Sequence, residues 1–68
     1  MGKQILTARE KEVFELLVKN KSTKEIAVEL NISEKTVRNH ISNAMQKLGV
    51  KGRAGAVVEL IKMKEIIL

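Results

Sequence analysis

The 68-residue chain contains no cysteine, aspartate, tryptophan, tyrosine or proline, and it has only one phenylalanine and one histidine. Without cysteine, neither a disulfide nor a Cys-based metal site can form within one chain. A Ser-His-Asp relay lacks its aspartate, so that only glutamate could take its place, and His40 has no second histidine with which to hold a metal. Phe14 alone cannot provide the stacking platform that single-stranded nucleic acid needs. We therefore expect no catalytic residue, no metal and no cofactor.

Long apolar runs and turn-forming residues are also scarce. No apolar run approaches the ~20 residues of a membrane span, and the first residues lack the apolar segment of a signal peptide. A cytoplasmic protein without a membrane partner is therefore expected. Because β-turns rely on proline and glycine, the absence of the first and the presence of only four glycines favour an all-α fold. The length predicts one domain over residues 1–68, with 1–5 flexible and a core small enough to gain from a partner surface.

Positive charge is concentrated in one part of the chain. Residues 19–53 carry eight basic and three acidic side chains, and these account for the whole net charge of +5, since the remaining basic and acidic residues cancel. A high isoelectric point is common among small proteins and would by itself be weak evidence. Confinement of the charge to one segment is better evidence for an anionic partner.

Two capping boxes predict the first two helices. Thr7 and Glu10 form the pattern T-x-x-E before an apolar stripe that fades near 19–21. Ser22 and Glu25 repeat the pattern and open a second, shorter helix. Both patterns let a hydroxyl and a carboxylate satisfy amides that the first turn of a helix leaves without partners.

Asparagine and glycine mark where the helices end. Asn20 and Asn31 can adopt the left-handed backbone conformation that a sharp turn needs. Ser33 is expected to cap a third helix at 34–48, with Gly49 just past its end. A fourth helix is expected at 53–65, and because its start lacks a good polar cap we expect that start to fray.

The expected helix 34–48 has two different sides. At about 100° per residue, its apolar residues form a stripe suited to a core, while its polar residues share an arc of roughly 100° on the other side. The stripe comprises Val37, Ile41, Ala44 and Leu48, and the arc comprises Lys35, Arg38, Asn39, Ser42 and Gln46. An ordinary solvated face would explain the arc taken alone. The short helix and turn before it, together with the local charge, favour a surface that contacts DNA.

The residues between the second and third helices have the spacing of a helix-turn-helix core, which consists here of Ile26, Ala27, Leu30, Ile32, Val37 and His40. The sequence also resembles the LuxR/FixJ/NarL-type DNA-binding domains. The matching segments follow in order and without gaps, and they are LTAREKEV at 6–13, KEIAVEL at 24–30, ISEKTVRNHI at 32–41, QKLGVKGR at 46–53 and AVVEL at 56–60. The resemblance implies a compact four-helix domain in which the third helix enters a major groove and the fourth is available for dimerisation.

The resemblance also implies which residues contact double-stranded DNA. Base-reading positions fall on Arg38, Asn39 and Ser42, and backbone contacts fall on Thr23, Lys24, Lys35, Thr36 and Lys47. Arginine can hold guanine and asparagine can hold adenine through paired hydrogen bonds, whereas lysine supplies charge without sequence information. RNA polymerase is a further partner that the resemblance implies, and a nucleoid-associated location in the cytoplasm follows from the DNA partner.

The fourth helix presents two apolar stripes. One comprises Ala54, Val57, Val58 and Ile61, and the other comprises Ala56, Leu60 and Met63. We expect one stripe to complete the core and the other, Ala56, Leu60 and Met63, to form the interface of a homodimer. The alternative is that the domain covers both stripes itself, with the last three residues folding back.

The sequence therefore predicts a dimeric, sequence-specific transcription regulator, and the resemblance, which extends to stand-alone regulators of this family, implies control of sporulation and spore-coat genes. Met1 and the small size favour a stand-alone regulator over the output domain of a longer protein. A helical protein-interaction or dimerisation module that acts through the fourth helix without specific DNA binding is the alternative. A membrane-active amphipathic helix is disfavoured, because the basic residues are spread over several helices and no aromatic anchor is present.

Overall fold

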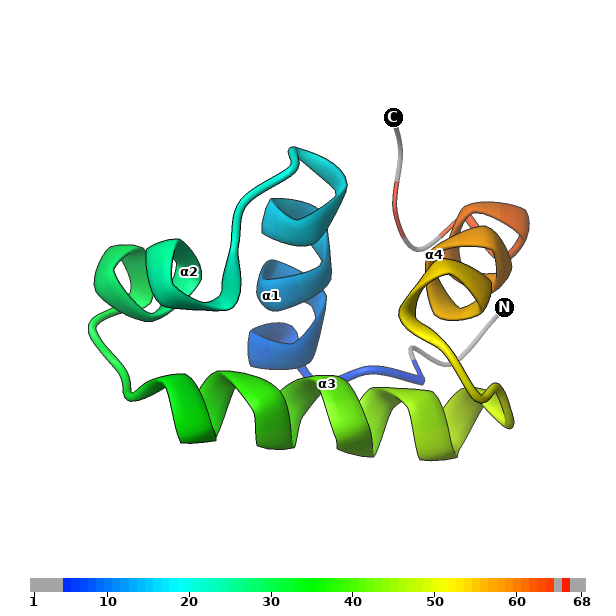
Figure 1. Cartoon of the computed structure of the whole chain (residues 1–68). Coiled ribbons are helices and arrows are strands. Elements are labelled where there is room, and N and C mark those ends of the chain that lie inside the picture. Colours follow the sequence, from blue (N-terminus) through cyan, green and yellow to red (C-terminus); the bar gives the residue numbers. More distant parts are fainter. Residues whose placement is uncertain (1–4, 65, 67–68) are drawn as a thin grey trace.

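The computed structural model describes residues 5–64 and 66, and these residues form four α-helices joined by short turns (Figure 1). The helices are α1 (Ala8–Val18), α2 (Thr23–Leu30), α3 (Glu34–Leu48) and α4 (Arg53–Lys62). No strand occurs within the described residues, which confirms the all-α prediction. The expectation of a flexible start concerns mainly residues 1–4, which lie outside the described part of the chain.

Both predicted capping boxes are present. The Thr7 hydroxyl accepts a hydrogen bond from the backbone N–H of Glu10 at 3.1 Å, and the Glu10 carboxylate accepts one from the N–H of Thr7 at 3.0 Å. The same exchange joins Ser22 and Glu25 at 3.1 and 2.8 Å. These bonds satisfy amides that the first turn would otherwise leave unpaired, and they fix where α1 and α2 begin.

The turns also form as predicted. Asn20 and Asn31 adopt left-handed backbone angles, with φ of 67° and 58°, and Gly49 follows α3 with φ of 69°. At the start of α3, the Ser33 hydroxyl accepts a hydrogen bond from the N–H of Thr36 at 3.0 Å. Each chain reversal that α2 and α3 require is therefore made by a residue type that tolerates positive φ.

The fourth helix is shorter than predicted. Its N-cap residue, Gly52, makes no side-chain capping hydrogen bond, as expected from the sequence, but the helix ends at Lys62 and not at residue 65. Lys64 has a φ of 61°, and the N–H of Ile66 reaches the carbonyl of Leu60 at 3.4 Å. The chain thus turns back after Lys62. This turn brings Ile66 into the core, where only 2% of its surface is exposed.

Glycine inside α4 permits a simple stability test. A Cβ atom added at Gly55 would lie 3.6 Å from Cβ of Val50, which is an ordinary van der Waals distance. Replacing Gly55 by alanine should therefore raise the free energy of unfolding by about 0.5–1 kcal/mol, measured by urea denaturation. Gly49→Ala is the matched control and should destabilise the domain, since its φ of +69° disfavours a side chain even though nothing lies within 4 Å. A loss of stability in Gly55→Ala would contradict this account of α4.

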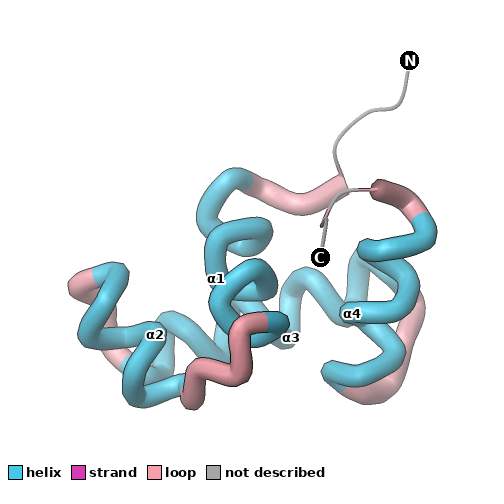
Figure 2. The backbone as a smooth tube through the Cα atoms, turned by 90° about the horizontal axis from the view of Figure 1, so that it is seen from above, coloured by secondary structure: helices cyan, strands magenta, loops and turns pink. Residues whose placement is uncertain are grey.

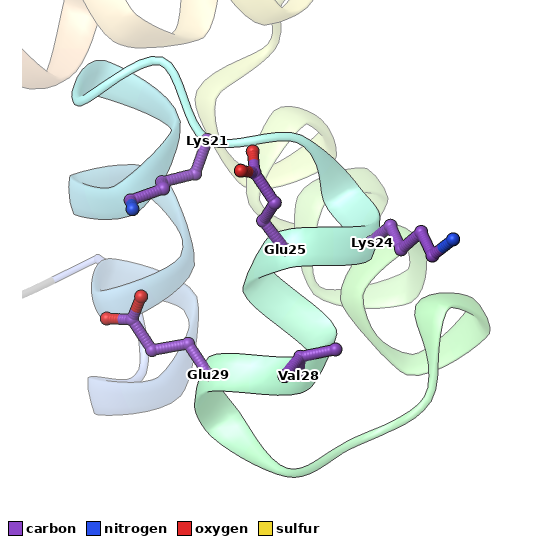
Figure 3. Close-up of a pocket in the computed structure, with 5 residues that line it drawn as sticks. All are labelled: Lys21, Lys24, Glu25, Val28 and Glu29. Atoms are coloured by element: carbon purple, nitrogen blue, oxygen red, sulfur yellow. The ribbon is translucent and has the colours of Figure 1, made fainter.

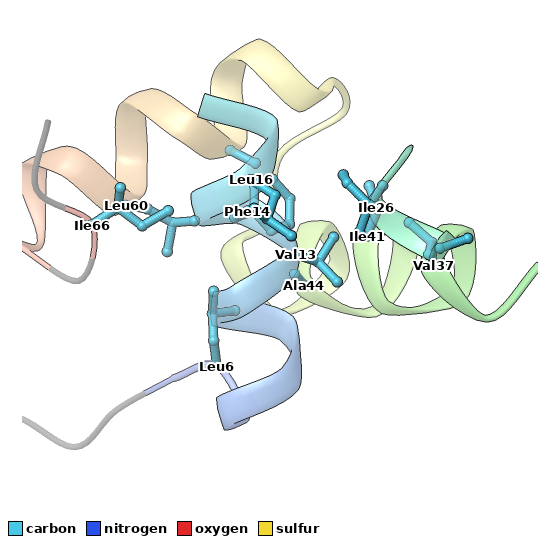
Figure 4. Packing of buried hydrophobic residues seen from close by; sticks show 12 residues of the cluster. Leu6, Val13, Phe14, Leu16, Ile26, Val37, Ile41, Ala44, Leu60 and Ile66 are labelled. Atoms are coloured by element: carbon cyan, nitrogen blue, oxygen red, sulfur yellow. The ribbon is translucent and has the colours of Figure 1, made fainter. Parts of the chain in front are cut away.

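The core lies between α3 and the other three helices. Figure 1 shows α3 along the bottom of the molecule, with α1, α2 and α4 all above it and so on the same side of α3. Figure 2 shows α1 between α2 and α4. Every helix contributes to the core, and so do one residue before α1 and one residue after α4 (Figure 4). The core comprises Leu6, Val13, Phe14, Leu16, Ile26, Ala27, Val37, Ile41, Ala44, Ala56, Leu60 and Ile66. Because its neighbours all pack from one direction, α3 keeps its other side free.

Candidate nucleic-acid interface

The free side of α3 is the polar arc that the sequence predicts. Val37, Ile41 and Ala44 are buried against the other helices, with at most 3% of their surfaces exposed. The residues on the arc are all exposed, namely Lys35, Arg38, Asn39, Ser42 and Gln46. The structure thus brings the three predicted base-reading residues together on one unobstructed helix face. It does not test what they contact, and that role remains a prediction.

Four of the five predicted phosphate contacts lie in the first turns of α2 and α3. Lys24 and Lys35 are exposed, while Thr23 and Thr36 are half-buried, and the Thr36 hydroxyl lies 2.8 Å from that of Ser33. In each helix the capping serine binds the third amide of the first turn. The amides before it have no partner within the helix and carry the positive end of its dipole, which suits a phosphate group.

Lys47 has a partner within the protein. Its Nζ atom donates a hydrogen bond to Oε1 of Glu10 at 2.7 Å, and the Glu10 side chain is only 4% exposed. The same carboxylate oxygen accepts the capping hydrogen bond from Thr7. The predicted contact of Lys47 with the DNA backbone stays a prediction, and what the structure shows is that Lys47 joins the end of α3 to the beginning of α1. The sequence could not reveal this pair, since its members lie 37 positions apart.

The charge of Glu10 is stabilised by its surroundings. Burial by itself would raise the pKa of the Glu10 carboxyl, but the hydrogen bonds from Lys47 and from the backbone of Thr7 outweigh it, with help from the Coulombic interactions with Lys47 and His40. The net effect is a pKa below the ordinary value, so Glu10 is ionised at neutral pH. The pair therefore acts as a charged tie between α1 and α3.

Replacing Lys47 by methionine should destabilise the domain without changing how it contacts phosphate. The change leaves the buried Glu10 carboxylate without its cation, and we expect a loss of about 1–3 kcal/mol in the free energy of unfolding in urea. The salt dependence of DNA binding by the folded protein should stay the same, because the Lys47 ammonium is already paired with the Glu10 carboxylate. Unchanged stability, with a salt slope that is shallower by about one unit, would instead restore Lys47 as a phosphate contact.

The predicted dimer interface on α4 needs correction. Ala56 and Leu60 have no exposed surface and belong to the core, so they cannot contact a second chain in the folded domain. The other stripe is the accessible one: Ala54 is exposed, Val58 is 50% exposed and Ile61 is half-buried. Met63, the third residue of the predicted interface, lies just past the helix and is 39% exposed. Ala56 and Leu60 therefore complete the core, Val57 of the other stripe is also packed against it, and the accessible apolar side chains are those of Ala54, Val58 and Met63.

A second exposed apolar surface lies on α2. Val28 is 77% exposed and borders a hollow of about 490 Å³, lined also by Lys21, Lys24, Glu25 and Glu29. Figure 3 shows Lys24 and Val28 on the side of α2 away from α1, whereas Lys21 and Glu29 extend towards α1. All five residues come from α2 and the turn before it, so the hollow lacks the convergent polar groups from several elements that a small-molecule site has.

The described residues contain neither a candidate metal site nor a candidate membrane span. Within residues 5–64 and 66, no group of three or more His, Cys, Asp or Glu residues is placed to hold a metal ion. In the same part of the chain, no helix has the length and apolar character needed to cross a bilayer.

Comparisons with known proteins agree with this geometry. Residues 4–60 match the family described as bacterial regulatory proteins, luxR family. The chain is 76% identical over 65 residues to the spore germination protein GerE of Bacillus subtilis, covering 96% of this chain and 88% of that protein. It is 53% identical over 58 residues to the transcriptional regulatory protein DegU of Brevibacillus brevis, but it spans only 25% of the length of that relative.

Solved structures show the same arrangement of helices. A structure of the transcription factor GerE superposes with a TM-score of 0.93 at 57% sequence identity, covering 96% of this chain and 97% of that one. The response regulator ChrA of a heme-sensing two-component system superposes with a TM-score of 0.86 at 35% identity, covering 97% of this chain and 33% of ChrA. The all-α helix-turn-helix fold is thus shared by both.

Proposed function

The chain belongs to the luxR family of bacterial regulatory proteins, and we infer that it regulates transcription by reading double-stranded DNA with α3. The relatives that it matches are transcription regulators and not enzymes. The single observation that carries the proposed mode of reading is the free polar face of α3, a helix whose opposite face packs against the core through Val37, Ile41 and Ala44.

The proposed contacts divide into two groups. Arg38, Asn39 and Ser42 lie on the face that would enter the major groove and read base edges. Lys24 and Lys35, with the amides of the first turns of α2 and α3, would hold the phosphates on either side. The charged tie between Glu10 and Lys47 supports the proposal, because it joins α3 to α1 and so helps to hold the reading helix in place.

We propose that the regulator works as a dimer through the exposed stripe of α4, formed by Ala54, Val58 and Ile61. A second copy of the chain is the proposed occupant, since a twofold pair would place two α3 helices over half-sites about 34 Å apart, or a multiple of that distance. A domain of this size also has a small core, and burial of apolar side chains between two copies would add to its stability.

The proposed target genes are those of spore development. The relative that supports this is GerE, which is named a spore germination protein and matches along 88% of its length. RNA polymerase is proposed as a further partner because the relatives regulate transcription, and the bacterial cytoplasm at the nucleoid is the proposed location.

The deciding experiment is selection of bound duplexes from a random library, followed by titration of the selected and a scrambled duplex at several salt concentrations. The proposal expects two related half-sites at a fixed spacing and binding that weakens as salt rises. If no duplex binds in a salt-sensitive way, the DNA-reading function is wrong. The alternative would then hold, namely a protein-interaction module that acts through α4.

Replacing Lys35 by alanine should weaken binding to the selected and the scrambled duplex by similar factors. Lysine at this position supplies charge to a phosphate and no base contact, so the slope of log K against log salt should become shallower by about 0.9. The matched control is Lys19→Ala, which removes an exposed lysine at the C-terminal end of α1. Equal changes of slope in both variants would show that the Lys35 effect is only one of net charge.

A further inference from the structure

Glu34 is the one acidic residue on α3 and the one acidic residue between 31 and 53. It stands at the first position of the helix, immediately beside the proposed base-reading face. A carboxylate at this place repels DNA phosphates and lowers the affinity for every duplex. Its favourable interaction with the helix dipole explains why it does not harm the helix, but not why it lies next to Arg38.

The geometry relates Glu34 to Arg38. Oε1 of Glu34 lies 3.6 Å from Nη1 of Arg38, one turn further along the helix, and the two side chains are 45% and 56% exposed. A guanidinium has five N–H donors arranged in a fork. Contact through Nη1 leaves its other nitrogens free, and these can still form a bidentate pair with guanine.

We propose that Glu34 is a positioning residue for sequence discrimination, an inference that rests on the proposed function. In the free protein its carboxylate holds the Arg38 guanidinium over the helix face and neutralises its charge. Arg38 is thereby less available to phosphates of any sequence, and it is already oriented when a matching base edge arrives. Glu34 thus lowers nonspecific affinity and raises the ratio of specific to nonspecific binding.

The test compares Glu34→Gln with the unchanged protein on the library-selected duplex and on a scrambled duplex of the same length. Affinity for the scrambled duplex should rise about fivefold. This factor corresponds to the loss of the interaction between two unit charges about 4 Å apart in water. Affinity for the selected duplex should rise less or fall, so the discrimination ratio should drop several-fold. The matched control is Glu12→Gln, which removes an exposed carboxylate from a 3.5 Å pair with Arg9 on α1 and should leave the ratio unchanged.

A double-mutant cycle shows whether Glu34 acts through Arg38. In an Arg38→Ala background, Glu34→Gln should no longer lower the ratio. An undiminished drop in that background would overturn the proposal, because Glu34 would then contact bases directly. An unchanged ratio in the otherwise native protein would also overturn it, as would a drop explained by lower thermal stability. These failures differ from failure of the proposed function, in which the unchanged protein would bind neither duplex in a salt-sensitive way.

Discussion

Replacing Val58 by aspartate should lower the affinity for a duplex with two half-sites by about 10²–10⁴-fold, because two linked reading helices gain that factor over separate ones. Val58 is 50% exposed at the centre of the free stripe of α4, so the change leaves the core intact. It places a carboxylate in the proposed twofold interface, where an unpaired charge opposes burial. Affinity for a duplex with one half-site should stay the same.

The matched control for Val58→Asp is Val28→Asp on α2, where valine is 77% exposed. Both variants add the same charge to an exposed helix position. The quantity to compare is the ratio of affinities for the two-half-site and the one-half-site duplexes, because direct effects of the new charge on DNA cancel in that ratio. Only Val58→Asp should lower this ratio of affinities. If it persists in both variants, α4 does not join the two copies.

Replacing Arg38 or Asn39 by alanine should lower the affinity for the selected duplex by about 1–3 kcal/mol in each case, the usual value of a bidentate base contact. Both side chains stand on the exposed face of α3. Binding to a scrambled duplex should be largely retained, because it depends on phosphate contacts. Competition titrations with duplexes that carry single base changes would then show which base pair each residue reads, since a variant becomes indifferent to the base that it no longer contacts.

Arg9→Ala provides the control for Arg38→Ala. Arg9 is also an arginine in an intrahelical ion pair, 3.5 Å from Glu12, but it lies on α1. Its removal changes the net charge by the same amount and should reduce affinity for both duplexes equally and slightly. Should Arg38→Ala and Asn39→Ala both retain full preference for the selected duplex, α3 is not the reading element.

Local features of the fold were predictable because each depends on residues close in the chain. Thr7 and Glu10 can form a capping box however the helix packs in the fold, and Asn31 and Gly49 can adopt positive φ without contacts to distant residues. The polar arc of α3 was predictable for the same reason, since Arg38 and Ser42 are neighbours on any helix.

Features that depend on how helices meet could not be predicted. The two stripes of α4 are both apolar, and only the packing of α4 against α3 decides that Leu60 is buried and Val58 is exposed. The hydrogen bond between Lys47 and Glu10 could not be predicted because the two residues are distant in sequence. The early end of α4 likewise follows from the return of Ile66 to the core, which the sequence offers only as an alternative because the helical pattern of residues 53–65 does not indicate it.

The two hydrogen bonds that meet at one oxygen of Glu10 have a consequence for local opening. The same atom closes the cap of α1 and holds the ammonium group near the end of α3. Fraying at either place therefore weakens the other, and we expect the amides of these two distant segments to exchange with solvent deuterium as one cooperative unit. DNA that immobilises α3 would then slow amide exchange at the start of α1, a segment outside the proposed DNA contacts.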